Sequence, residues 1–426
     1  MPGTVFPIAA THLKICYNWR DSFLKFNELY GGFMLIIKNA KILTMAGISY
    51  DSGYIESMNG KITGIGPMSG YGLDETGKTV IDAGGKYLLP GLVDAHAHIG
   101  MIEDAVGFEG DDVNEMTDPV TPQLRALDGV YHADRSFEEA RQNGITTAVT
   151  GPGSANVIGG QFVALKTYGR TTDEMVVRQP CAMKIAFGEN PKTVYHEKHQ
   201  VPSTRMATAA ILREQLYKAK EYLQAINEYE EDKEENERPE FDMKLEALIP
   251  VIKRELVVKA HAHRADDIVT AIRIAKEFNL DMTLEHCTEG WLIPDVLKEA
   301  GYPVILGPLL TDRSKIELRN QSLKAPGILS QSGVEVSIMS DHPCVPLQHL
   351  LVCAALAVRE GMAEEEALKS VTINAARACR IEDRVGSLEL GKDADMVLFD
   401  GHPLNYLSKT RLTVINGKIV WENQEV

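Results

Sequence analysis

The chain has 426 residues, of which 44% are hydrophobic and 24% charged, a composition typical of a globular protein with a sizeable core. Its 44 basic and 60 acidic residues give a formal charge of -16, which argues against nucleic acid or an anionic membrane surface as the main partner. No stretch approaches the ~20 consecutive apolar residues that a membrane-spanning helix needs.

Residues 1–33 precede the first regular hydrophobic pattern, and we treat them as an N-terminal extension of unclear role. Trp19, Arg20 and Asp21 interrupt this segment, so it is not typical of a secretory signal peptide. The six cysteines are scattered and form no C-x-x-C pair. This pattern favours reduced thiols and a cytoplasmic location.

Residues 34–89 and 383–426 both contain short β-like patterns. Regular alternation begins with MLIIKNAKILTM, and the pairs Asn59-Gly60 and Asn416-Gly417 are typical of two-residue hairpin turns. Neither end of the chain is large enough to bury a core alone. We therefore expect the two ends to combine in one small β-sandwich domain.

Residues 90–382 alternate short apolar runs with helical patterns. Strands that alternate with helices predict an α/β fold with a parallel sheet, and eight strands predict a closed (β/α)8 barrel of the TIM type. An open doubly wound sheet is the alternative, but the glycines of GPGSANVIGG lack the spacing of a dinucleotide-binding loop. The eight runs are YLLPGLVDAHAH, GITTAVTG, GQFVALKTYG, CAMKIAF, LVVKAHAH, DMTLEHC, PVILGPLL and EVSIMSDH.

A helical insertion with the acidic cluster NEYEEDKEENERPE interrupts the barrel at about residues 204–252. Runs of like charge are usually solvated faces or mobile loops, and this is the interpretation we favour. The alternatives are a lid over the site or a contact in a homo-oligomer.

The motif Asp94-Ala95-His96-Ala97-His98 is the strongest chemical signal. Residues two apart on a strand face the same side, so His96 and His98 can bind one metal ion through imidazole nitrogens. They lie at the carboxyl end of the first barrel strand, where barrel active sites are built. The motif predicts a metal centre on this rim.

Other barrel strands end in residues of the same chemical types, namely His261, His263, His286 and Asp341. Ends of parallel strands meet on one rim, which favours a joint metal site over isolated roles. Lys184 lies inside the apolar run CAMKIAF and could react with CO2 to form a carbamate that bridges two metals. A lysine that lies along the barrel wall or binds a substrate carboxylate is the alternative, and Glu189 is the alternative oxygen ligand.

Candidate substrate contacts lie on three loops. The loop after the second strand offers polar side chains, although a glycine-rich turn explains that loop equally well. Two basic residues after the seventh strand could bind a carboxylate of the substrate, or they could be exposed on the surface without such a role. A histidine next to Asp341 could orient that carboxylate or contact substrate. These candidates are Ser154, Asn156 and Gln161, then Arg313 and Lys315, and finally His342.

The segment PGLVDAHAH and the tail TINAARACRIEDRVGSLELGKDADMVLFDG resemble the metal-dependent amidohydrolase superfamily, in the branch of imidazolonepropionase and the metal-dependent prolidases. The resemblance covers residues 34–426. It implies one or two divalent ions, with Zn²⁺ expected and Fe²⁺ or Mn²⁺ as alternatives. The implied ligands are His96, His98 and Asp341 around one ion, Lys184 as a bridging carbamate, and His261 and His286 at the second ion. His263 resembles a residue that contacts substrate or supports the ligands, and it could exchange roles with His261.

The resemblance also implies hydrolysis of a C–N bond in a small amide, cyclic amide or dipeptide-like molecule. A metal acidifies the attacking water, and Asp341 takes its proton and passes it to the leaving nitrogen. A mononuclear imidazolonepropionase-like enzyme, a deaminase and a non-catalytic assembly protein are the alternatives. Related deaminases carry a glutamate three residues after the strand-five histidine, where this chain has Arg264 or Asp266. The complete ligand set argues against an assembly role, so we expect a small-molecule substrate.

Overall fold

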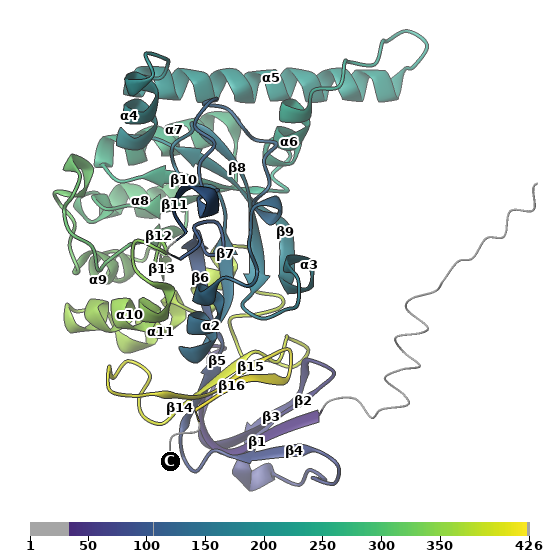
Figure 1. Cartoon of the computed structure of the whole chain (residues 1–426), viewed down its shortest axis with the longest axis vertical. Coiled ribbons are helices and arrows are strands. Elements are labelled where there is room, and N and C mark those ends of the chain that lie inside the picture. Colours follow the sequence, from purple (N-terminus) through teal and green to yellow (C-terminus); the bar gives the residue numbers. More distant parts are fainter. Residues whose placement is uncertain (1–33, 105, 424–426) are drawn as a thin grey trace, which may run out of the picture.

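The computed structural model describes residues 34–104 and 106–423, so the predicted extension at 1–33 lies outside the described residues. Figure 1 shows a barrel of strands and helices beside a β-rich unit, which both ends of the described chain build together. The long helix α5 (Arg205–Glu231) lies at the opposite end of the molecule from this unit. Within the described ranges, no helix combines the length and apolar character required to cross a membrane.

Hydrogen bonds join the strands of the small β domain into one continuous sheet in the order β16-β15-β14-β5-β1-β2-β3, with β4 paired to β1. Strand β5 connects the two ends of the chain, because it pairs in parallel with β1 and antiparallel with β14. The predicted hairpins are present, and Asn59, Gly60, Asn416 and Gly417 all have the positive φ that such turns require. The strands are β1 (Met34–Leu43), β2 (Ser49–Met58), β3 (Lys61–Pro67), β4 (Thr79–Asp82), β5 (Tyr87–Pro90), β14 (Met396–Phe399), β15 (Thr410–Ile415) and β16 (Lys418–Glu422).

The barrel contains eight strands, each at one of the eight apolar runs, so the predicted fold class is confirmed. Hydrogen bonds from Asp341 N to the His96 carbonyl (3.2 Å) and from His98 N to the His342 carbonyl (2.9 Å) link the last strand to the first at the rim. The strands are β6 (Leu92–Ala97), β7 (Ile145–Thr150), β8 (Ile158–Lys166), β9 (Val176–Ala186), β10 (Val257–Ala262), β11 (Met282–His286), β12 (Val304–Leu306) and β13 (Val336–Ile338).

One strand corrects the expectation of a fully parallel barrel. Strand β8 runs antiparallel to both β7 and β9. Only residues 151–157 separate β7 from β8, whereas a parallel crossover needs roughly a dozen residues or more. The reversal places the start of β8 at the rim with the metal-binding motif. Its last residue, Lys166, lies at the other end, next to the small β domain.

The helices cover the outside of the barrel (Figure 1). Helices α5 and α6 form the predicted insertion, and the acidic segment 232–241 joins them and is almost entirely exposed. Thr204 and Asp242 cap these two helices by accepting hydrogen bonds from backbone N–H groups of the first turn. Helix α6 spans Met243–Ile252. The other helices are α2 (Arg135–Gln142), α3 (Thr172–Met175), α4 (Glu189–Glu197), α7 (Ala265–Phe278), α8 (Pro294–Ala300), α9 (Ala325–Gln331), α10 (Leu350–Arg359), α11 (Glu364–Ser370) and α12 (Ile373–Ala378).

Candidate metal centre and active site

Three buried side chains converge at the carboxyl ends of the first and last barrel strands. Asp341 Oδ1 lies 3.4 Å from His98 Nε2 and 3.7 Å from His96 Nε2. These distances exceed those of ordinary hydrogen bonds. Two ligand atoms at about 2.1 Å from one tetrahedral ion lie about 3.4 Å apart, so the spacing fits a shared divalent cation.

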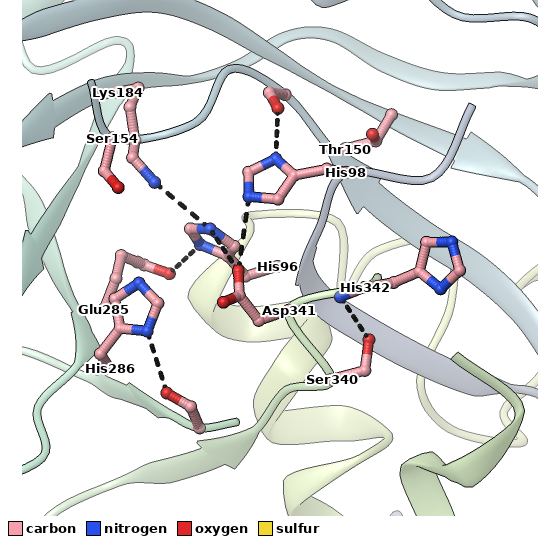
Figure 2. Close-up of polar contacts among 12 residues, drawn as sticks. His96, His98, Thr150, Ser154, Lys184, Glu285, His286, Ser340, Asp341 and His342 are labelled. Atoms are coloured by element: carbon pink, nitrogen blue, oxygen red, sulfur yellow. Dashed lines mark hydrogen bonds and ion pairs between the residues drawn. The ribbon is translucent and has the colours of Figure 1, made fainter. Parts of the chain in front are cut away.

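Hydrogen bonds at the far side of each ring orient the imidazoles (Figure 2). His96 Nδ1 lies 2.6 Å from Glu285 Oε2, and His98 Nδ1 lies 2.7 Å from the Gly151 carbonyl. The Nδ1 atom of His286 lies 2.9 Å from the Gly307 carbonyl. Each bond engages Nδ1, so the Nε2 atom is the one that can act as a ligand, which is the usual arrangement of metal-binding histidines.

A second cluster of potential ligands lies next to the first cluster, which is formed by His96, His98 and Asp341. The potential ligand atoms of His261, His263 and His286 all lie within 4.8 Å of one another, and the same holds for those of His96, His286 and Asp341. His286 therefore belongs to both groups. Burial lowers the pKa of His96, His261 and His286 well below 6.5, which keeps these rings in the neutral form that binds metal.

Lys184 lines the cavity together with residues of both clusters. Its side chain is 1% exposed, and its Nζ is 3.3 Å from His96 Nε2. Burial lowers the pKa of this lysine to about 8, which raises the fraction of neutral amine able to react with CO2. The carbamate stays a prediction. Glu189, the alternative oxygen ligand, is at the start of α4 and borders a neighbouring cleft.

Two charged residues beneath the ligands were missed in the sequence. Glu285 is fully buried next to His286, and its Oε2 accepts from both His96 Nδ1 and Lys259 Nζ, the latter at 3.1 Å. Lys259 Nζ also donates to the Ala95 carbonyl at 3.0 Å. Both residues lie in strands that are buried along their whole length, and a charged residue within such a short strand was the signal that could have found them.

The ligand clusters face a cavity of about 270 Å³ at the rim. Polar side chains from two loops and from the first turn of α4 are hydrogen-bonded to one another along its lining, because Lys315 Nζ donates to Asn190 Oδ1 at 2.7 Å and Asn190 Nδ2 donates to Ser154 Oγ at 2.6 Å. Eight of the residues predicted from the sequence line this cavity: His98, Ser154, Lys184, His261, His263, His286, Lys315 and Asp341. His96 lies beneath them, fully buried.

Four predicted substrate contacts do not line the cavity. Asn156 donates to Glu115 O and Thr121 Oγ1 and accepts from Tyr195 OH, so it holds the loop in place. Three other candidates are held elsewhere: Gln161 Nε2 donates to Pro122 O, Arg313 Nη2 donates to Gln321 O, and His342 Nδ1 accepts from Leu347 N.

The direction of the His342 ring is visible in Figure 2, where it points away from the cluster around Asp341. Its backbone still contributes to the rim, because its carbonyl accepts from His98 N. Burial lowers the pKa of His342 to about 4, so the ring is neutral near pH 7. Whether His342 contacts substrate stays a prediction.

Comparisons with known proteins agree with this geometry. The sequence profile of the amidohydrolase family matches residues 87–420. Amidohydrolase tasK of Hapsidospora irregularis is 29% identical over 348 residues, which are 76% of this chain and 35% of that protein. This chain therefore spans about a third of that relative's length. An imidazolonepropionase of Fusobacterium nucleatum subsp. nucleatum is 26% identical over 402 residues, or 87% of this chain and 92% of that protein.

A solved structure is also similar to this chain. The amidohydrolase from Thermotoga maritima MSB8 has a TM-score of 0.87 and 41% identity to this chain, and the match covers 91% of this chain and 100% of that one. The family profile spans both the barrel and most of the small β domain. Sequence, fold and ligand geometry thus agree that this chain belongs to the amidohydrolase family.

Proposed function

We propose that this protein is a metal-dependent hydrolase that cleaves a C–N bond in a small amide, cyclic amide or dipeptide-like molecule. The observation that carries the proposal is the spacing of 3.4 and 3.7 Å between Asp341 Oδ1 and the Nε2 atoms of His98 and His96. Membership of the amidohydrolase family and the similarity to imidazolonepropionase support hydrolysis of C–N bonds.

The donor set suits a divalent transition metal. His96, His98 and Asp341 would hold one ion, with His286 beside them, and imidazole with carboxylate is compatible with Zn²⁺, Fe²⁺ or Mn²⁺. When bound, such an ion supplies Lewis acidity, which acidifies water and polarises a carbonyl oxygen. A carbamate on Lys184 would add oxygen donors between this ion and a second one.

Asp341 is the acid–base residue in this proposal. Burial by itself would raise the pKa of its carboxyl group, but His98 and Lys184 lower the pKa below its ordinary value. The carboxylate is therefore ionised at neutral pH and can take a proton from the attacking water at a side-chain oxygen. The same oxygen then returns the proton to the leaving nitrogen.

The cavity limits the size of the substrate. A volume of about 270 Å³ accommodates a small molecule rather than a long peptide. The mouth carries Lys315, Asn190 and Ser154, which can hydrogen-bond polar groups of a substrate. His263 also lines the cavity, where it can contact the substrate.

Metal analysis combined with a substrate screen tests the proposal. The purified protein is expected to contain transition metal, or to take it up on reconstitution, and to hydrolyse at least one N-acyl amino acid, hydantoin-like ring or dipeptide. Chelation should abolish that activity, and added metal should restore it. A protein that refuses all transition metals on reconstitution would overturn the proposal.

A further inference from the structure

The charged side chains of the cavity occupy an inner and an outer position. Apart from the histidines, the charged residues that line it are Lys184, Asp341 and Lys315. Lys184 and Asp341 are buried beside the imidazoles of the candidate metal centre. Lys315 is exposed and directly precedes the short turn η5 (Ile316–Leu318). Its ammonium group is therefore the charge that a molecule meets when it enters the outer part of the cavity.

The contacts of Lys315 hold its ammonium group in place without neutralising it. Lys315 Nζ donates to Asn190 Oδ1 at 2.7 Å, and Asn190 Nδ2 donates to Ser154 Oγ at 2.6 Å. An ammonium group has three N–H donors, so donors remain for a ligand, as does the hydroxyl proton of Ser154. Within residues 34–104 and 106–423, no ion pair involves Lys315.

The acidic residue two positions further along the chain has other contacts. Glu317 Oε2 accepts from the backbone N–H of Glu189 at 3.1 Å, and Glu317 Oε1 lies 3.6 Å from His263 Nε2. The charge of Lys315 acts on the interior of the cavity instead. Burial is the main reason that the pKa of His263 falls to about 3, and Lys315 lowers this pKa further. An anionic group of a bound molecule would supply the missing partner of the ammonium.

The structure also distinguishes the two basic residues of this loop, between which the sequence left the choice open. Arg313 Nη2 donates to the Gln321 carbonyl at 3.1 Å. The arginine lines a different cleft, together with Gln321 and Lys324. Lys315, by contrast, lines the same cavity as the candidate metal ligands. Of the two residues, Lys315 is thus the one placed to contact a substrate.

We infer that Lys315 is a specificity-determining residue that binds a carboxylate of the substrate, so that the protein prefers anionic amides to neutral ones. One ammonium group balances the single charge of a carboxylate, and charge-assisted hydrogen bonds are the stronger ones. The substrate class is then N-acyl amino acids, dipeptides with a free carboxylate, or cyclic amides that carry one. This inference rests on the proposed function, because the scissile bond is assumed to lie at the inner histidines.

Matched pairs of compounds test the inference on the metal-loaded, full-length protein. Each acid in a screen of N-acyl amino acids, dipeptides and cyclic amides is compared with its carboxamide, which has a similar shape but no charge. In the best pair, the wild type is expected to hydrolyse the acid with a kcat/KM at least ~10-fold above that of the carboxamide, because only the acid gains a charged partner.

Variants of the loop assign this preference to one residue. Lys315→Met removes the charge but keeps much of the side-chain length, and it should raise KM for the acid about 10-fold with a smaller effect on kcat. The KM for the carboxamide should change less than ~3-fold. Lys315→Arg should retain the preference for the acid. Arg313→Met is the matched control, because it removes a charge from the same loop outside the cavity and should leave the preference at the wild-type value.

Binding provides a readout that does not require turnover. If no pair is hydrolysed, calorimetric titration of the zinc-loaded protein with N-acetylglycine and N-acetylglycinamide decides. The wild type is expected to bind the acid at least ~10-fold more tightly than the carboxamide, and Lys315→Met is expected to abolish this difference.

Several outcomes would overturn the inference. Equal kcat/KM for acid and carboxamide in the wild type does so and leaves the proposed function intact, and so does equal or undetectable binding of both probes. A Lys315→Met variant that keeps the preference, or that raises KM equally for both compounds, shows that Lys315 does not recognise the charge. A protein that takes up no metal defeats the proposed function itself.

Discussion

The two ends of the barrel differ in how their buried charged and polar groups are paired. At the end next to the small β domain, Lys166 Nζ binds Asp393 at 2.9 Å and Asp395 at 2.5 Å, and Asp393 also binds Arg384 and Lys61. At the rim, Glu317 Oε1 and both ring nitrogens of His261 have no hydrogen-bond partner among residues 34–104 and 106–423. Charge that is fully paired stabilises the junction between two domains, whereas unpaired polar atoms at the rim are available to a ligand.

The largest effect is expected at the rim, on catalysis. Asp341→Asn keeps an oxygen donor but removes the carboxylate that accepts a proton, so kcat should fall by about 10³-fold or more. Metal content should stay near that of the wild type. Steady-state kinetics and metal analysis on one preparation check both expectations. Substantial remaining activity with normal metal content would remove Asp341 from the acid–base role.

A large effect on stability is expected at the opposite end. Lys166→Met leaves Asp393 and Asp395 in a buried site without this lysine, and the free energy of unfolding should fall by about 3–5 kcal/mol. Denaturant unfolding measures the loss, and metal content should not change. Lys218→Met is the matched control, because Lys218 pairs with Glu214 on an exposed helix face and its removal should cost less than about 0.5 kcal/mol. Equal losses in the two variants would contradict the contrast between the ends.

A smaller effect is expected beneath the metal ligands. Glu285→Gln weakens the acceptor that orients His96 and removes the counter-charge of Lys259. Metal affinity should fall by about 10-fold to 100-fold, as is typical when a group that supports a ligand is changed. Competition with a chelator measures this affinity. An unchanged affinity would show that backbone packing alone orients His96.

The smallest effect is expected in the acidic segment. Replacing residues 232–241 with a short Gly/Ser linker removes exposed charge but keeps α5 and the Asp242 cap of α6. Stability should change by no more than about 0.5 kcal/mol, and metal content should stay the same. Loss of metal would mean that this segment supports the barrel.

Much of the candidate site was predictable because its residues end strands. His96, His98, His261, His286 and Asp341 each follow an apolar run, and the strands of a barrel bring such ends to one rim. Asn156 and Arg313 follow strands as well, but the structure directs them to backbone carbonyls and side chains away from the cavity. Loop residues are hard to assign from sequence, because a loop can turn either face toward the site.

The eight barrel strands, the two hairpin turns and the positions of the candidate ligands follow from the sequence alone, because these features depend on local periodicity and on turn chemistry. The pairing of Lys166 with Asp393 and Asp395 and the approach of Glu317 to His263 depend instead on the three-dimensional packing of the chain. These features join residues far apart in the chain, and their partners are selected by packing and by the need to pair buried charge.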